Sequence, residues 1–300
     1  MSTAPPWVSH RILVRQAILQ ADVENTSPLR IGSGRDPPLG SQADLAVVRI
    51  YRNGRDEPYI PGSSLKGVFR SVGEAMARAE KNLQVCSGLA KSTCMDLKQI
   101  DGVRLGDQVG SKLRRNDVEG AINLFNRYAC LMCKIFGAPS YGAHVYFVDA
   151  YVTGEYTINT RTGIAIDRRT GAAFRGALYT VEYVEPGSTF RLGIHTTNLP
   201  NYVLGMFAKI MKMVDRGEVR VGGFKTRGFG ELKLKSVNVR IKDLRKPGSM
   251  VLEKMDEKDI EADLGGLVEF RDGFLHAEGD GAHQVLDRLE EVWDRANLTD

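Results

Sequence analysis

Residues 59–71 read YIPGSSLKGVFRS, and they predict a short strand that turns sharply into a helix. Pro61 and Gly62 favour the turn, and the hydroxyl group of Ser63 or Ser64 could cap the first free amides of the helix. The apolar residues that follow recur at helical spacing and predict one buried face: Leu65, Val68, Phe69, Val72 and Met76.

Two cations lie one helical turn apart on another face of this predicted helix, Lys66 and Arg70. Free amides, the positive end of the helix dipole, hydroxyl groups and cations together suit a phosphate group. An ordinary amphipathic helix with a serine cap has the same pattern. The stretch alone therefore leaves both interpretations open.

Composition indicates a globular chain with an uneven distribution of charge. The 300 residues are 42% hydrophobic, enough for a sizeable core. The sequence has neither an apolar run of membrane-spanning length nor an N-terminal signal stretch, so we expect a soluble, cytoplasmic protein without a membrane partner. Residues 251–300 carry fifteen acids against five bases, a net −10, which leaves about +14 on the rest. This favours an anion-binding body with an acidic appendix, although a tail that only aids solubility would look the same.

Hydrophobic periodicity predicts an α+β fold with an antiparallel layout. The predicted strands are residues 11–21, 44–51, 145–152, 179–183, 190–194 and 232–241, and the predicted helices follow residue 61 or span 203–211 and 284–295. Asn53-Gly54 is a hairpin turn signal, and a phase break near Ser236 predicts a bulge. This order is compatible with a ferredoxin-like or RNA-recognition-type core, and with other α+β folds.

Four cysteines occur as two pairs, Cys86-x7-Cys94 and Cys130-x2-Cys133. A Cys-x-x-Cys pair can place two thiolates at one tetrahedral metal ion, and a second pair would complete a structural zinc site. Without a secretion signal, metal is favoured over disulfides in an extremophile cytosol or free core cysteines. Cys86 is the least secure ligand because its spacing is irregular, and His144 is a conceivable substitute.

Two further segments combine glycine with basic residues. Residues 222–230 read GGFKTRGFG and place Lys225 and Arg227 among four glycines, which would let backbone amides approach a phosphate closely. Such turns also occur for packing reasons alone. Residues 154–176 are polar and rich in glycine and arginine, so we expect this arm to need a partner that orders it.

Together these segments resemble the RAMP superfamily of CRISPR proteins, in particular the backbone subunits of type III (Csm/Cmr type) effector complexes. Four segments occur in the family's order: LRIGSG at 29–34, the helix start at 59–71, Cys-x-x-Cys followed by IFG at 135–137, and the loop at 222–230. The resemblance implies a ferredoxin-like, RNA-recognition-type palm with an inserted zinc-bearing subdomain and a β-hairpin thumb at 154–176.

The resemblance also implies a domain organisation. Residues 8–81 would form the first part of the palm, with a glycine-rich loop and the phosphate-binding helix, and residues 82–143 would form the inserted zinc-binding subdomain. Residues 144–242 would complete the palm and carry the thumb and the second glycine-rich loop. Residues 243–300 would be an acidic C-terminal appendix with a terminal helix.

Guide-RNA contacts follow residue by residue from the same resemblance. The expected RNA-binding residues are Arg30, Ser33, Ser64, Lys66, Arg70, Arg168, Arg169, Lys225 and Arg227. The thumb would press on the guide–target duplex, with Arg168, Arg169 and Arg175 as its candidate contacts to the RNA backbone. Related subunits often have histidine where this chain has Arg30, which preserves RNA contact but argues against an acid–base role there.

The expectation of an enzymatic activity depends on Asp44. Target-cleaving backbone subunits have an aspartate on the loop before the first hairpin, and Asp44 matches this position better than the nearby Asp36. A carboxylate there could orient or deprotonate a target 2′-hydroxyl group, or hold a magnesium or manganese ion near the scissile phosphate.

The resemblance therefore predicts a metal-dependent endoribonuclease that acts within an assembled complex. Copies of the chain would stack in a helical filament along a guide RNA, beside other subunits, and would cleave complementary target RNA at regular intervals. One alternative is a non-catalytic RNA-binding scaffold of the same fold. Another is a guide-RNA-processing endonuclease, which is disfavoured because such enzymes usually use a histidine near the first helix and none of the five histidines lies there.

Overall fold

Strand β1, Arg15–Asn25, lies inside a large sheet in the computed structural model, which describes residues 4–32 and 43–299. Its side chains alternate between buried and partly exposed positions, because every second residue of a strand faces the core. The sequence predicts an earlier start that includes Ile12 and Leu13. That prediction is wrong, since these side chains are 64% and 45% exposed and precede the strand.

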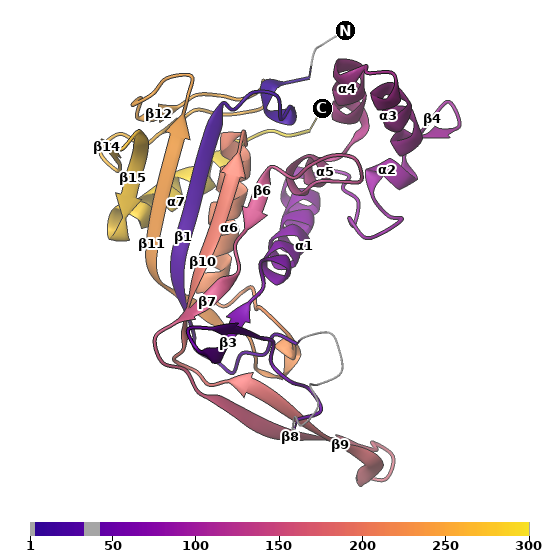
Figure 1. Ribbon diagram of the computed structural model, residues 1–300, viewed down its shortest axis with the longest axis vertical. Helices are drawn as coiled ribbons and strands as arrows, with labels where there is room; N and C mark the ends of the chain where they lie inside the picture. Colours follow the sequence, from indigo (N-terminus) through magenta and orange to yellow (C-terminus); the bar gives the residue numbers. More distant parts are fainter. Residues whose placement is uncertain (1–3, 33–42, 300) are drawn as a thin grey trace.

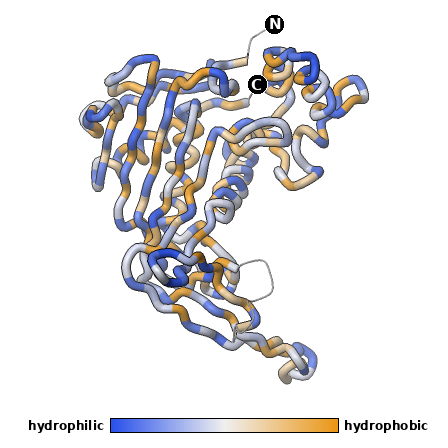
Figure 2. The backbone as a smooth tube through the Cα atoms, in the orientation of Figure 1, coloured by the Kyte–Doolittle hydropathy of each residue, from blue (hydrophilic) through white to orange (hydrophobic). Residues whose placement is uncertain are grey.

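Nine strands of the described residues form one antiparallel sheet, which confirms the predicted α+β class. Their order is β14-β15-β11-β1-β10-β7-β3-β2, and β6 pairs with β10 beside this path. The other strands of this sheet are β2 Arg49–Arg52, β3 Arg55–Ile60, β6 Val145–Phe147, β7 Ala150–Thr153, β10 Thr189–Thr197, β11 Leu232–Asp243, β14 Glu269–Arg271 and β15 Phe274–Glu278. The predicted bulge near Ser236 is confirmed by a register shift between β1 and β11. Along these strands, hydrophobic and hydrophilic residues alternate (Figure 2).

The longest helices pack against this sheet and against one another. They are α1 Gly62–Lys81, α6 Asn201–Asp215 and α7 Gly279–Arg295. Helices α6 and α7 lie behind β1, β10 and β11 in Figure 1, and α1 contacts α6 and β6. Met206, Phe207 and Ile210 of α6 are fully buried, so this helix contributes to the core. None of the described helices has both the length and the apolar character needed to cross a bilayer.

An inserted group of short helices lies between α1 and β6 (Figure 1). It contains α2 Cys94–Leu97, β4 Gln99–Ile100, β5 Val103–Arg104, α3 Leu105–Arg114, α4 Val118–Tyr128 and α5 Leu131–Phe136. The sequence predicts only one helical stretch here, around Ala121 and Phe125, and the structure corrects this. The other helices are hard to recognise because they are short, and α3 buries only Leu105 and Val109.

A two-stranded hairpin projects from one end of the main sheet (Figure 1). It consists of β8 Ile158–Ile166 and β9 Ala173–Val184. The strand predicted at 179–183 is the second half of β9 rather than a separate element. Four large apolar side chains of this hairpin are exposed: Ile164, Ile166, Phe174 and Leu178.

The acidic C-terminal residues extend the main sheet. Strand β15 pairs with β11, a small ladder joins β12 Val251–Leu252 to β13 Ala262–Asp263, and α7 packs on α6. The helix predicted at 284–295 lies within α7, whose Leu289 and Trp293 are buried.

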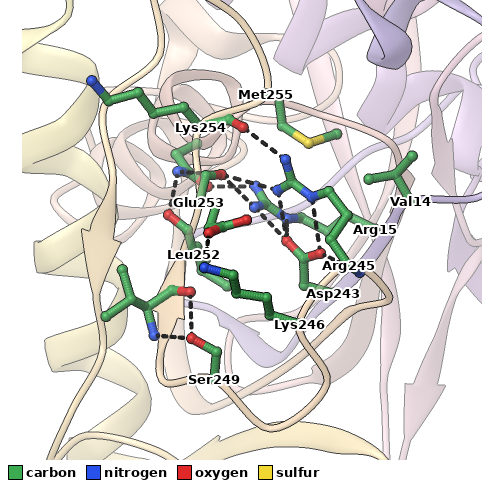
Figure 3. Close-up of polar contacts among 12 residues, drawn as sticks. Val14, Arg15, Asp243, Arg245, Lys246, Ser249, Leu252, Glu253, Lys254 and Met255 are labelled. Atoms are coloured by element: carbon green, nitrogen blue, oxygen red, sulfur yellow. Dashed lines mark hydrogen bonds and ion pairs between the residues drawn. The ribbon is translucent and has the colours of Figure 1, made fainter.

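A buried arginine joins this C-terminal part to the first strand (Figure 3). Arg15 donates from Nε and Nη2 to Oδ2 of Asp243 at 3.0 and 2.7 Å, and from Nη1 to Oδ1 of Asn201 at 2.5 Å. Its Nη2 also donates to the carbonyl oxygen of Glu253 at 2.7 Å. Burial opposes ionisation of Asp243, but hydrogen bonds from Arg245 and Arg15 hold its pKa below the ordinary value. This network fixes β1, β11 and α6 relative to one another.

Candidate functional site

Three segments that are far apart in the sequence line one open cavity of about 320 Å³. They are the loop after β1, the first turns of α1 and the glycine-rich loop before β11. The lining residues are Ile31, Gly32, Ser64, Gly67, Val68, Ser71, Gly222, Gly223 and Lys225. The fold therefore brings together three of the segments that the sequence singled out.

Close backbone contact holds the two glycine-bearing loops together. The amide of Gly223 donates to the carbonyl oxygen of Arg30 at 2.8 Å. Gly222 has a φ of 90°, and a Cβ atom on it would lie 2.4 Å from that same oxygen. Only glycine satisfies both the conformation and the approach. On the other side, Val48 donates to the carbonyl oxygen of Ile31 at 2.8 Å.

Phe224, which the sequence analysis did not single out, organises the cations around this cavity. Its ring centroid lies 5.5 Å from the guanidinium carbon of Arg30 and 5.1 Å from that of Arg227. It also stacks on Tyr179 of β9, whose hydroxyl group accepts a hydrogen bond from Arg227. Burial lowers the pKa of Arg30. These cation–π contacts fix the loop against the base of the hairpin. In the sequence, the signal for this role of Phe224 was an aromatic residue between the glycines of the 222–230 loop.

Lys225 and Lys66 have no ion pair within residues 4–32 and 43–299, and Lys66 lies in the same turns of α1 as the lining residues Ser64 and Gly67. Lys225 is exposed and lines the cavity. Lys66 is half-buried, and it has neither an ion pair nor a hydrogen bond among the described residues. Burial, followed by repulsion from Arg70, lowers the pKa of Lys66. Both ammonium groups are free to meet an anion.

The start of α1 differs from the serine-capped helix that the sequence predicts. Pro61 is the N-cap residue, and neither Ser63 nor Ser64 caps with its side chain. Instead the amide of Gly62 donates to Oδ1 of Asp149 at 2.7 Å, a partner from the loop between β6 and β7. This carboxylate offsets part of the positive end of the helix dipole. Attraction for an anion at this cavity therefore depends more on lysine side chains than on the helix end.

Arg70 points away from the cavity. Its Nε donates to Oε1 of Glu74 at 3.0 Å, and its guanidinium carbon lies 5.8 Å from the ring centroid of Phe136. Its side chain is 15% exposed. Arg70 therefore faces the inserted helices rather than the segments that line the cavity.

The predicted hairpin arginines lie at the tip of the β8–β9 hairpin. Arg168 and Arg169 are exposed in the turn that joins its strands, where the amide of Arg169 donates to Oδ1 of Asp167 at 2.8 Å. Neither residue lines the cavity. Ser33 lies outside the described residues.

Asp44 lies at the base of the same hairpin. It is exposed, and its Oδ2 accepts a hydrogen bond from the amide of Thr180 in β9 at 2.7 Å. The next residue, Leu45, forms a bridge with Val181. One carboxylate oxygen of Asp44 is therefore engaged with backbone. Asp44 does not line the cavity, and its competitor Asp36 lies outside the described residues.

The four cysteines form one cluster, as the sequence predicts. All four Sγ atoms lie within 4.8 Å of one another, from Cys86 after α1, Cys94 at the start of α2, and Cys130 and Cys133 at the start of α5. His144 is not an alternative ligand, which corrects that expectation. Its ring nitrogens contact the hydroxyl group of Tyr141 at 2.8 Å and the carbonyl oxygen of Thr197 at 3.0 Å.

The electrostatics of this cluster favour a cation. Thiol hydrogen bonds lower the pKa of Cys86 and lower that of Cys130 to about 6, while hydrogen bonds with Cys130 raise the pKa values of Cys94 and Cys133. Four thiolates cannot coexist without a positive charge between them, and a divalent metal supplies it. Tetrahedral zinc bonds of about 2.3 Å place sulfur atoms about 3.8 Å apart. The cluster is compact enough to hold a metal ion such as zinc.

The chain matches a known protein family and is similar to solved structures. A family model described as the RAMP superfamily matches residues 22–233. No curated protein matches the chain. Among solved structures, the chain is similar to one titled "Cryo-EM structure of the Type III-B Cmr-beta bound to cognate target RNA", with 16% identity and a TM-score of 0.44. The similarity covers 75% of this chain but only 61% of that chain.

Proposed function

This chain belongs to the RAMP superfamily, and on that premise we propose that it is a guide-RNA-binding backbone subunit of a type III CRISPR effector complex. The observation that carries the proposal is the cavity where the two glycine-bearing loops meet α1. Its partners are guide RNA, target RNA, further copies of the chain in a helical filament and the other subunits of the complex. The complex works in the cytoplasm.

The cavity suits the RNA backbone rather than particular bases. The amides of Gly32 and Gly222, the Ser64 hydroxyl group and the Lys225 ammonium group can contact phosphate oxygens. Contacts of this kind position a strand without reading its sequence. Lys66, Arg30 and Arg227 add positive charge around the same opening, while the arginines of the 154–176 thumb contact the guide–target duplex at a distance from it.

The arrangement of the main sheet supports a ferredoxin-like palm. The chain runs through β1, α1, β7, β10, α6 and β11, and these strands lie side by side in the order β11-β1-β10-β7. The palm comprises residues 8–81 and 144–242, and residues 82–143 are an insertion whose cysteines hold one structural zinc ion. Residues 243–300 are the C-terminal part of the subunit.

We assign target cleavage to Asp44, with magnesium or manganese supplying charge at the scissile phosphate. The carboxylate oxygen that does not bind Thr180 is the group that orients or deprotonates the 2′-hydroxyl group of the target. The hydrogen bond to Thr180 also favours the second candidate function, a non-catalytic scaffold in which Asp44 only caps a strand.

The test uses an assembled complex with guide RNA and complementary target RNA, in magnesium or manganese. Asp44→Asn keeps an acceptor for Thr180 but removes the charge, so target binding should persist while cleavage slows by about two to four orders of magnitude. Asp36→Ala is the matched control and should cleave like wild type. Regular cuts that persist in Asp44→Asn would refute the catalytic role. Wild-type complexes that bind target but never cut it would establish the scaffold.

A further inference from the structure

Arg70 contains a buried donor without an acceptor. Its Nη2 atom is inaccessible to solvent and has no hydrogen-bond partner among the described residues. The same guanidinium is held in place through Nε, which donates to Glu74 at 3.0 Å. Native structures rarely bury a donor in this way, because its lost hydration is not replaced. No cysteine Sγ atom accepts from Nη2 here, so this buried donor, held in one orientation, points to an acceptor that takes its position only when an ion is bound.

The surroundings of this guanidinium come from the segments that carry the cysteines. Gly88 follows Cys86 by two residues, and a Cβ atom on Gly88 would lie 2.0 Å from Cζ of Arg70. Phe136, whose ring lies 5.8 Å from Cζ, ends the helix that contains Cys133. Burial opposes ionisation of Arg70, but the hydrogen bond to Glu74 and the charges of Cys133 and Cys86 raise its pKa above the ordinary value. No side chain larger than glycine at position 88 would leave room for this approach.

We propose that Arg70 is an outer-sphere residue of the metal site: its Nη2 group donates a hydrogen bond to a metal-bound thiolate of the cysteine cluster. This inference rests on the proposed zinc site. Four thiolates around a divalent ion leave two excess negative charges in a half-buried place, and the guanidinium offsets one of them. Hydrogen bonds to metal ligands also orient those ligands. Glu74 fixes the direction of the guanidinium, so Arg70 is a positioning residue and not a ligand.

Zinc affinity of the full-length chain tests this assignment. Metal-free protein, kept reduced, is titrated with zinc against a chelator of known affinity for wild type, Arg70→Gln, Arg70→Lys and Arg288→Gln. Arg288 is the control because it is half-exposed on α7, where it pairs with Glu291 at 3.2 Å. We expect Arg70→Gln to weaken zinc binding about 10- to 100-fold, as outer-shell substitutions do, and Arg288→Gln to leave it unchanged.

Two further readouts separate positioning from general packing. Cobalt(II) loaded into Arg70→Gln should keep the absorption spectrum of a four-thiolate site, because no ligand is lost. The melting temperature of the metal-free chain should change much less than that of the zinc-loaded chain. Equal losses in both forms, with unchanged zinc affinity, would mean that Arg70 only packs, and would overturn the proposal.

The outcomes distinguish this inference from the zinc site itself. Stoichiometric zinc in wild type with unchanged affinity in Arg70→Gln overturns the role of Arg70 alone. A wild-type chain that binds no zinc overturns both, whereas RNA binding at the cavity is measured separately. If Arg70→Gln fails to fold, Arg70→Lys carries the test, since it keeps the charge that Glu74 pairs with but lacks the planar fork. Wild-type affinity in that variant would then overturn the proposal.

Discussion

Arg15 and Arg70 are both arginines whose guanidinium groups are largely removed from solvent, and they differ in how their donors are used. Arg15 donates to Asp243, Asn201 and Glu253, so all three of its side-chain nitrogens have acceptors. Arg70 uses Nε for Glu74 and leaves Nη2 without a partner. The buried guanidinium group of Arg15 therefore finds all of its acceptors within the protein itself. On the proposal made above, the acceptor for Nη2 in the cysteine insertion would be in place only after a metal ion has bound.

Disruption of the hydrogen-bond network around Arg15 should have the largest effect on stability. Arg15→Met leaves Asp243 as a buried carboxylate with one fewer cation, so we expect a loss of about 3–5 kcal/mol in the free energy of unfolding. Urea denaturation measures it, and the double variant Arg15→Met, Asp243→Leu should recover much of the loss. Zinc affinity should not change. A loss below about 1 kcal/mol would mean that the network contributes little.

Binding of zinc to the cysteine cluster should have the next largest effect. Zinc at about 100 times its dissociation constant should stabilise the chain by about 2.7 kcal/mol, because only the folded cluster binds it tightly. Hydrogen exchange should slow in residues 86–136 and change little in β1 and β11. Cys133→Ser is the control and should lose this response. Uniform protection across the whole chain would contradict a separate, metal-dependent region.

Acid should loosen the boundary between the two regions. His144 stacks on His10 at 4.0 Å, and burial, then His10, lowers its pKa to about 4 from an ordinary 6.5. The folded state therefore favours neutral His144, so its contribution is complete above pH 6.5 and disappears as the pH falls toward 4. Lowering the pH from 7 to 5 should therefore reduce the free energy of unfolding by about 2 kcal/mol. Urea denaturation at both values measures it, and His144→Gln should show a shallower dependence. An equally steep dependence in that variant would assign the effect to other groups.

The smallest expected effect is at the open cavity. Lys225→Gln removes one phosphate contact, so the slope of log K against log salt for single-stranded RNA should fall by about 0.7. Lys91→Gln, an exposed lysine of the insertion, should leave the slope unchanged. Fluorescence anisotropy at several salt concentrations measures both. A slope unaffected by Lys225→Gln would remove the cavity from the RNA path.

Local patterns predicted local features well. Asn53-Gly54 forms the expected hairpin turn, with φ values of 54° and 81°, because a two-residue turn depends on its own residues. The helical spacing of Met206 and Phe207 identified a core helix, and Cys-x-x-Cys identified one half of the cysteine cluster. These features are set by residues close in sequence.

Features that depend on distant partners were not predictable in the same way. The cap of α1 comes from Asp149, 87 positions away from the amide it binds, so serine hydroxyl groups were the wrong candidates. Arg70 fits the pattern of a phosphate-binding cation, but its guanidinium group contacts Glu74 and Phe136 instead of lining the cavity. The role of Phe224 required the approach of Arg30, which lies on another loop.

The β8–β9 hairpin has a consequence for the chain before it is assembled. Its exposed Ile164, Ile166, Phe174 and Leu178 form apolar surface on an arm that projects away from the core. Exposed apolar strands promote association between unassembled molecules. We therefore expect the purified chain to aggregate in a concentration-dependent way at temperatures well below its melting temperature. In the cell, synthesis of this subunit in excess of its partners would promote aggregation more than modest heating would.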